Sequence, residues 1–313
     1  METSKTAGQY GAATEQQIEW LSKAREYLKE NLLKNLQAGM QTFDPNFSFS
    51  KQDWQRLSDV TIKEFMAADA HFYFPDPSQA GFFYGKTEFG GFYDGSCINL
   101  SSKEIKSYFD MLRTITHEFF HYLQEIGGCP AEPHVSDPAR QLLSVSFSEG
   151  SAEFLTQLAL CQDAVFKRYM DAAAVNKNMA GQIEFAVPYP SETFCIYALL
   201  KTGTVSPTAF LDASLGYMHK AENTEFVGFE PGASFKTQIT DSLGEKIFTQ
   251  LFSPNKAKSP WTYDHAVDMV RLLYAALRKN GVNTYALEEN AGSDLALFSK
   301  PFSSAQSSGS LFG

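Results

Sequence analysis

We predict an α+β fold for this chain, with a small N-terminal lobe of helices and an antiparallel sheet, followed by a mostly helical C-terminal lobe. Three observations support this prediction. Apolar residues recur at helical spacing near the N-terminus, short runs rich in aromatic residues and glycine follow before residue 100, and helical spacing then returns. With 313 residues, 43% of them apolar, the chain has enough material for one large domain or two lobes.

The N-terminal lobe is expected to begin with two helices, over residues 15–36 and 51–68. Two extended runs follow at residues 81–84 and 91–100. Because a polar segment flanked by glycines, residues 85–90, separates these runs, we expect a hairpin or two adjacent strands.

A long helix is predicted directly after the strands. Ser101 to Glu104 have the spacing of a capping box, apolar residues then repeat at helical intervals up to Ile126, and Gly127 and Gly128 are expected to end the helix. Further helices are predicted over residues 148–174, 191–200, 211–221, 243–251 and 264–279.

We place the boundary between the two lobes at the end of the long helix. The N-terminal α+β lobe then covers residues 1–126, and the helical lobe covers residues 127–302. Residues 303–313 are rich in Ser and Gly and are expected to form a flexible tail. The two lobes are expected to form one catalytic unit.

The charge of the chain limits its partners. Its 26 Lys and Arg residues stand against 36 Asp and Glu residues, which gives a net charge of -10. Because an acidic surface repels phosphate backbones and anionic lipid heads, we expect no nucleic-acid partner and no membrane insertion. A protein, a peptide or a small substrate is the expected partner, and the sequence leaves the oligomeric state open.

The sequence also indicates a compartment. The N-terminal residues lack the basic-then-apolar order of a secretory signal, so the cytoplasm is the default, while delivery as an effector by a specialised secretion machine stays open. The four cysteines, Cys97, Cys129, Cys161 and Cys195, are far apart and never form a CxxC pair. We therefore expect free thiols.

The most informative motif lies within the long helix and reads His117-Glu118-Phe119-Phe120-His121. Residues four apart share one helical face, so the two imidazoles can bind one Zn²⁺ from adjacent turns. Glu118 can reach a water on that ion and act as its general base. The spacing therefore predicts one catalytic zinc ion.

A catalytic zinc ion normally takes a third protein ligand. Glu149 is the preferred candidate because it opens a second helix, where Gly150 permits a close helix approach. His134 and Asp137 are alternatives in a proline-rich loop, although the HxxGxxH spacing is absent. Glu153 is expected to accept the far N–H of a zinc-bound imidazole, and the two glutamates could exchange roles.

Two sequences, HEFFH at 117–121 and SEGSAEF at 148–154, together resemble the gluzincin group of zinc metallopeptidases, the thermolysin-like clan. The segment GGFYDGSCINLS before the helix resembles the edge strand with which that group binds substrate. The resemblance spans roughly residues 81–203 and implies a zincin-like fold. The chain departs from the group in having Glu rather than Asp at 153 and in lacking a GxMEN exopeptidase motif.

The resemblance also implies a Tyr or His that stabilises the oxyanion formed on the attacked carbonyl. Tyr189 is the preferred candidate, because it lies in a proline-flanked turn just before a predicted helix. Tyr197, His219 and His265 are the alternatives.

The resemblance implies a zinc metallopeptidase in which Glu118 acts as the general base. Because an edge strand can hold an extended peptide, we expect an endopeptidase that acts on a protein or peptide. Two alternatives stay open. One is a zinc hydrolase of a non-peptide amide or ester, and the other is a non-catalytic metal-binding interaction protein with a zincin-like fold.

Overall fold

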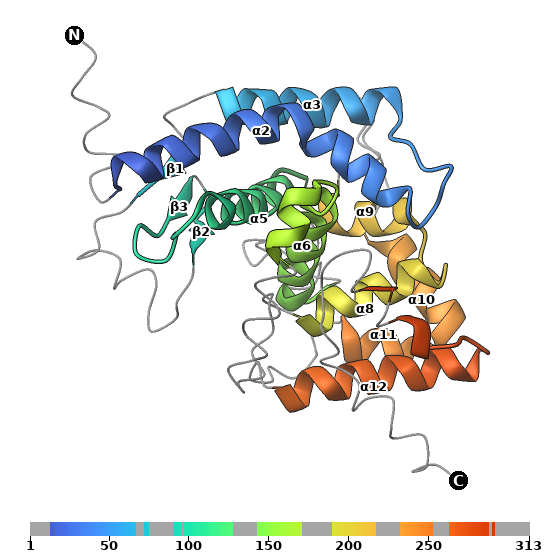
Figure 1. Cartoon of the computed structure of the whole chain (residues 1–313). Coiled ribbons are helices and arrows are strands. Elements are labelled where there is room, and N and C mark those ends of the chain that lie inside the picture. The colour runs from blue at the N-terminus through green and yellow to red at the C-terminus, as the bar shows by residue number, and fades with distance from the viewer. Residues whose placement is uncertain are drawn as a thin grey trace. The chain divides into compact units, whose positions relative to one another are not determined.

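The computed structural model describes residues 13–66, 72–74, 90–95, 97–127, 143–170, 190–216, 232–252, 263–287 and 290–291. These residues are mostly helical and include one small sheet (Figure 1), an arrangement compatible with the α+β class. The chain divides into two compact units, one of residues 1–37 and 48–123 and the other of residues 38–47 and 124–313. The predicted tail lies outside the described residues.

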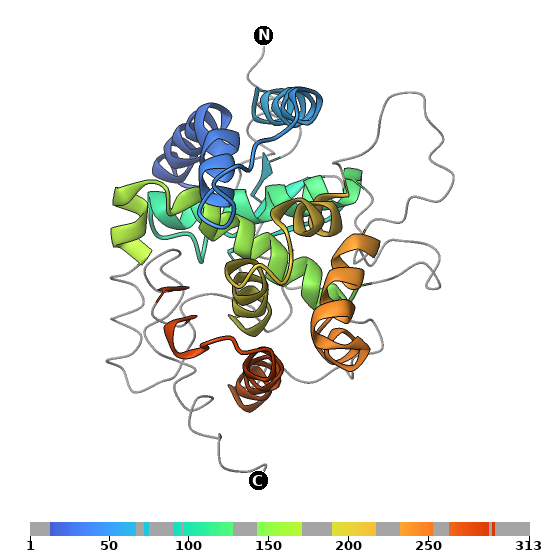
Figure 2. The same cartoon turned by 90° about the vertical axis from the view of Figure 1, so that its right-hand side faces the viewer.

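Two long helices, α2 (Glu15–Met40) and α3 (Lys51–Met66), lie beside each other in both ribbon views (Figures 1 and 2), and Figure 1 shows that they run in opposite directions. A side chain caps the first turn of each. The Thr14 hydroxyl accepts a hydrogen bond from the Gln17 N–H at 3.2 Å, which starts α2. The Ser50 hydroxyl accepts one from the N–H of the residue three positions later, at 3.1 Å, which starts α3. Both predicted helices are confirmed.

The sheet has three short strands, β1 (Phe72–Tyr73), β2 (Gly91–Tyr93) and β3 (Ile98–Leu100), in the order β1-β3-β2. β2 and β3 are antiparallel, with Phe92 opposite Asn99. β1 pairs with β3 in parallel, so the predicted antiparallel sheet is mixed. β2 is an edge strand of the described sheet.

The run that the sequence predicted as one strand, residues 91–100, contains both strands of a hairpin. Asp94 and Gly95 turn the chain between them, and Gly95 adopts a φ of 87°, which glycine tolerates without a steric penalty. The Asp94 carboxylate accepts a hydrogen bond from the Cys97 N–H at 2.9 Å and holds the turn closed. The other predicted strand, residues 81–84, lies outside the described residues.

Helix α5 (Tyr108–Gly127) carries the HExxH motif. Ser107 caps its first turn: the Asp110 N–H donates to the Ser107 hydroxyl at 3.1 Å, and that hydroxyl donates to the Asp110 carboxylate at 2.9 Å. The predicted cap, Ser101, instead accepts the Glu104 N–H at 3.2 Å in a preceding turn. The helix starts later than predicted because Ser107 and Asp110 provide a second capping pair.

The second unit is built from helices, which are α6 (Val145–Leu160), α8 (Pro190–Lys201), α9 (Pro207–Leu215), α10 (Ala233–Leu243), α11 (Glu245–Leu251) and α12 (Tyr263–Lys279). α8 packs against both α6 and α12. The core of this unit is aromatic: the Phe43 ring lies 5.9 Å from the Phe154 ring and 5.7 Å from the Tyr197 ring, centroid to centroid. These contacts bury α6 and α8 deeply.

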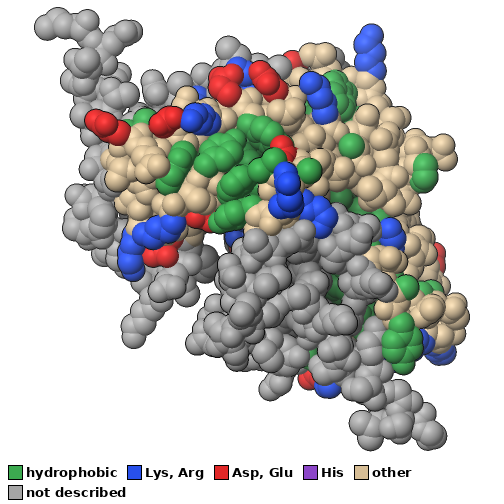
Figure 3. All heavy atoms as spheres, viewed as in Figure 1, with side chains coloured by type: hydrophobic (Ala, Val, Ile, Leu, Met, Phe, Trp, Pro, Cys, Tyr) green, Lys and Arg blue, Asp and Glu red, His purple; other side chains and the backbone are tan. Residues whose placement is uncertain are grey.

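The described part of the chain carries mixed surface charge and free thiols. Figure 3 shows acidic and basic side chains interspersed over the described part of one face, without a large patch of one sign. Cys97, Cys161 and Cys195 are free thiols, and Cys129 lies outside the described residues. Within the described residues, no helix is both long enough and apolar enough to span a membrane.

Candidate metal site

Two histidines one turn apart on α5 face each other. The Nε2 atoms of His117 and His121 lie 3.2 Å apart, and the two rings meet at 76° with their centroids 4.9 Å apart. Two nitrogens that each bind a tetrahedral zinc ion at about 2.0–2.1 Å lie about 3.3 Å from each other. The imidazoles therefore have the spacing that a shared ion requires.

A carboxylate completes the group. Ligand atoms of His117, His121 and Glu149 all lie within 4.8 Å of one another, and each of the three side chains is half-buried. Two imidazole nitrogens and one carboxylate oxygen leave a tetrahedral ion one position for water or substrate. This group could hold a metal ion.

A buried polar network holds the start of α6 close to α5. Gln124, one turn beyond His121, is fully buried, and its amide N–H groups donate to the Ser148 carbonyl at 3.0 Å and to the Ser151 hydroxyl at 2.9 Å. The Ser148 hydroxyl donates back to the side-chain carbonyl oxygen of Gln124 at 2.8 Å. Because Ser148 directly precedes Glu149, these three hydrogen bonds fix the backbone that presents the carboxylate.

In the sequence, Gln124 was noted only because it stands where the HxxGxxH spacing requires glycine. Its role in holding α6 was not predicted. An uncharged polar residue between apolar positions of an amphipathic helix is the signal that could have indicated it. Its partners, however, lie 24 and 27 positions along the chain, beyond the range of helical periodicity.

A second contact fixes α6 from the side of α8. A Cβ atom added to Gly150 would overlap the Cβ of Glu192, so the glycine allows α6 and α8 to approach closely. The sequence had predicted that Gly150 permits an approach to the HExxH helix instead. The Thr193 hydroxyl donates to the Gly150 carbonyl at 3.3 Å. Glu192 itself is fully buried and accepts the Ser191 hydroxyl at 2.7 Å. Sequence reasoning did not single out Glu192, which looks like an ordinary acidic residue in the first turn of a helix.

Glu118 is held by the edge strand. Its side chain is buried, and its Oε2 accepts a hydrogen bond from the Tyr93 N–H of β2 at 2.9 Å. The Tyr93 ring contacts the Tyr122 ring of α5 edge-on, with centroids 5.8 Å apart. These two contacts fix the position of one carboxylate oxygen relative to the strand.

The hairpin register explains why the Tyr93 N–H points away from β3. The Gly90 carbonyl accepts the Ser101 N–H at 2.8 Å, and the Asp94 N–H donates to the Cys97 carbonyl at 3.2 Å. Backbone groups alternate in direction along an antiparallel strand, so those of Gly91 and Tyr93 face the opposite side.

Glu153 is fully buried one turn after Glu149 on α6. Its Oε1 accepts a hydrogen bond from the Gln157 side-chain amide at 2.8 Å. Of the two glutamates, Glu149 is the one in the three-residue group with the histidines. The expected contact between Glu153 and a zinc-bound imidazole stays a prediction.

The remaining candidates are Tyr189, His134, Asp137 and His219, which lie outside the described residues, and His265, which lies in α12. The role of Tyr189 in stabilising an oxyanion therefore stays a prediction. Tyr197 is fully buried within α8, where its ring packs against the rings of Phe43 and Phe194. This packing identifies Tyr197 as a core residue.

Comparison with known proteins gave no match to a family model, to a curated protein or to a solved structure.

Proposed function

We propose that this protein is a zinc-dependent endopeptidase with a zincin-like active site. The observation that carries the proposal is the facing pair of imidazoles at 3.2 Å, with Glu149 in reach and the general-base candidate Glu118 fixed beside them. Two histidines and one glutamate are a ligand set typical of catalytic zinc in peptidases. A purely structural zinc site has no use for a carboxylate at position 118.

The proposed mechanism divides the work between the metal and the protein. His117, His121 and Glu149 would hold the zinc ion, which would supply Lewis acidity toward a water and the substrate carbonyl. Glu118 takes the proton of the attacking water and delivers it to the leaving amine. The Tyr93 N–H holds the Glu118 carboxylate in place during both transfers, and the reaction proceeds without a covalent intermediate.

The edge strand supports a peptide as the substrate. In β2 the backbone groups of Gly91 and Tyr93 face away from β3, and the Tyr93 N–H donates to Glu118. An extended chain that pairs with this edge through main-chain groups other than the Tyr93 N–H brings its own amide next to the general base. The backbone of β2 would thus bind the substrate beside the Glu118 side chain that transfers the proton.

The test combines metal analysis with peptide cleavage. Protein purified without chelator should contain near one zinc ion per chain, and it should cleave members of an unbiased peptide library. Glu118→Gln should keep the zinc and lose cleavage by at least about 100-fold, since general acid–base catalysis contributes roughly 10²–10⁴-fold.

Glu19→Gln is the matched control, because Glu19 is an exposed glutamate on α2, outside the motif. It should cleave as the wild type does. Equal cleavage by Glu118→Gln and the wild type would contradict the proposed mechanism. If the zinc-loaded wild type cleaves no peptide but hydrolyses simple amides or esters, the protein is a hydrolase of another class and not a peptidase.

A further inference from the structure

A second site lies away from the histidines, between α2 and α3. It is a cavity of about 370 Å³ whose walls include Glu30, Leu33 and Lys34 from α2 and Trp54, Ser58 and Thr61 from α3. The α3 residues lie at positions i, i+4 and i+7 and so share one helical face. This volume is at the lower end of the range for small-molecule pockets, which runs from about 300 to 1,000 Å³.

The hydroxyl of Thr61 is a sign of a missing ligand. Thr61 is 2% exposed, and its Oγ1 has no hydrogen-bond partner among the residues that the structure describes. Buried threonines in helices normally donate to the carbonyl four residues earlier. Thr116 and Thr156, which are buried within helices, do so at 2.7 and 2.8 Å. Thr61 differs from them in lining a cavity.

The lining of the cavity also carries charges from α2. Glu19 and Lys23, four residues apart, form an ion pair at 2.5 Å. Glu30 and Lys34 have the same spacing and both line the cavity, where their side chains are exposed at its rim, and neither forms an ion pair within the described part of the chain. The cavity therefore offers one charge of each sign.

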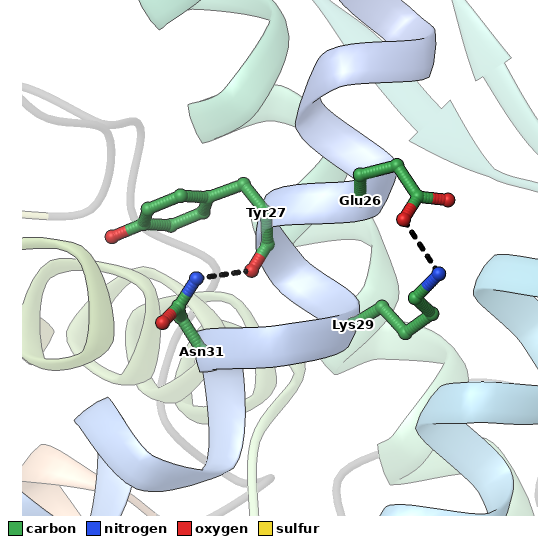
Figure 4. A network of polar contacts seen from close by, with 4 residues as sticks. All are labelled: Glu26, Tyr27, Lys29 and Asn31. Atoms are coloured by element: carbon green, nitrogen blue, oxygen red, sulfur yellow. Dashed lines mark hydrogen bonds and ion pairs between the residues drawn. The ribbon is translucent and has the colours of Figure 1, made fainter.

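Two further lining residues are already engaged, as Figure 4 shows. Lys29 pairs with Glu26 at 2.5 Å, and the Asn31 side-chain amide donates to the Tyr27 carbonyl at 2.9 Å. Their contacts run along α2 itself. The groups left for a ligand are thus Glu30, Lys34 and the hydroxyls of α3.

We propose that this cavity binds a small zwitterion, an α-amino acid with an apolar side chain. Its carboxylate accepts from Lys34 and from the Ser58 and Thr61 hydroxyls, and its ammonium group donates to Glu30. Its side chain packs on the Trp54 indole and Leu33. A simple anion fits less well, because Glu30 would oppose its charge. This site does not depend on the proposed peptidase activity.

The test uses L-leucine as the probe and the full chain as the protein. The chain has three tryptophans, and Trp54→Phe identifies the indole N–H signal of Trp54 in a nitrogen-15 spectrum. Leucine should shift this signal in a saturable way. Two analogues that each lack one charge, 4-methylpentanoate and 3-methylbutylamine, should bind about tenfold more weakly or worse.

Three variants locate the site. Thr61→Val keeps the shape and removes the hydroxyl, so it should weaken leucine binding about tenfold while the protein melts no lower than the wild type. Lys34→Met and Glu30→Gln should each weaken binding similarly. Thr202→Val, the same change at a threonine outside the cavity, should leave binding unchanged. The proposal is overturned if leucine causes no saturable shift, if 4-methylpentanoate binds as well as leucine, or if Thr61→Val binds leucine unchanged.

Discussion

Helices α5 and α6, which together supply the candidate metal site, are fixed by different kinds of contact. α5 is amphipathic: an apolar stripe that includes Leu112, Ile115 and Phe119 is buried, while both histidines stay half-buried. α6 is buried on all sides from Gly150 to Leu160, and buried hydrogen bonds hold its first turn. Local spacing therefore specifies the histidine pair, whereas contacts between distant segments position the third ligand.

The largest effect is expected from removing an α5 ligand. His117→Ala should lower zinc affinity by more than about 100-fold, because loss of groups that merely orient a ligand already costs roughly 10–100-fold. Competition of the protein with a chromophoric chelator measures the affinity. Retained stoichiometric zinc in this variant would show that the histidine pair is not the binding site.

The next largest effect concerns the network around Gln124. Gln124→Leu removes three buried hydrogen bonds and leaves the Ser148 and Ser151 groups without them, so the free energy of unfolding should fall by about 2–4 kcal/mol. Zinc affinity should fall as well, because the backbone before Glu149 is released. Urea unfolding of the metal-free protein separates the two effects.

Gln55→Leu serves as the control for this variant, since the Gln55 amide makes an exposed hydrogen bond on α3. It should change stability by less than about 0.5 kcal/mol. If Gln124→Leu behaves in the same way, the buried network does not hold α6.

The variant Gly150→Ala tests the close contact of α6 with α8 through the sign of its effect on stability. At an open helix position this change stabilises by about 0.5–1 kcal/mol. Here the new methyl group would overlap the Glu192 side chain, so we expect a loss of about 1–3 kcal/mol and weaker zinc binding through displacement of Glu149. Thermal unfolding and zinc titration measure the two quantities. A gain in stability would mean that α6 and α8 are not in close contact at this point.

The smallest effect is expected at the edge strand. Tyr93→Ala keeps the backbone N–H that binds Glu118 but removes the ring contact with Tyr122, which is worth about 0.5–1.5 kcal/mol. Under the proposed function, kcat should fall several-fold while zinc affinity stays the same. A fall in zinc affinity with unchanged kcat would indicate that β2 supports the metal ligands rather than the general base.

The same contrast explains how much the sequence could predict. Helices with apolar residues at helical spacing, such as Glu15–Met40 and Lys51–Met66, could be predicted because this signal is local. The hairpin within residues 91–100 was missed although Asp94-Gly95 is a common turn pair, because the aromatic run on both sides favoured one strand. The Gln124 network and the contact between Gly150 and Glu192 could not be predicted, since both join segments far apart in the chain.

The central claim is that α6 contributes the third ligand through Glu149. The most direct test compares the zinc affinity of Glu149→Ala with that of Glu153→Ala in the same chelator competition. We expect Glu149→Ala to lose more than about 100-fold and Glu153→Ala to lose about 10–100-fold, as for a group that orients a ligand. The reverse order, or equal affinity of Glu149→Ala and the wild type, would contradict the assignment of Glu149.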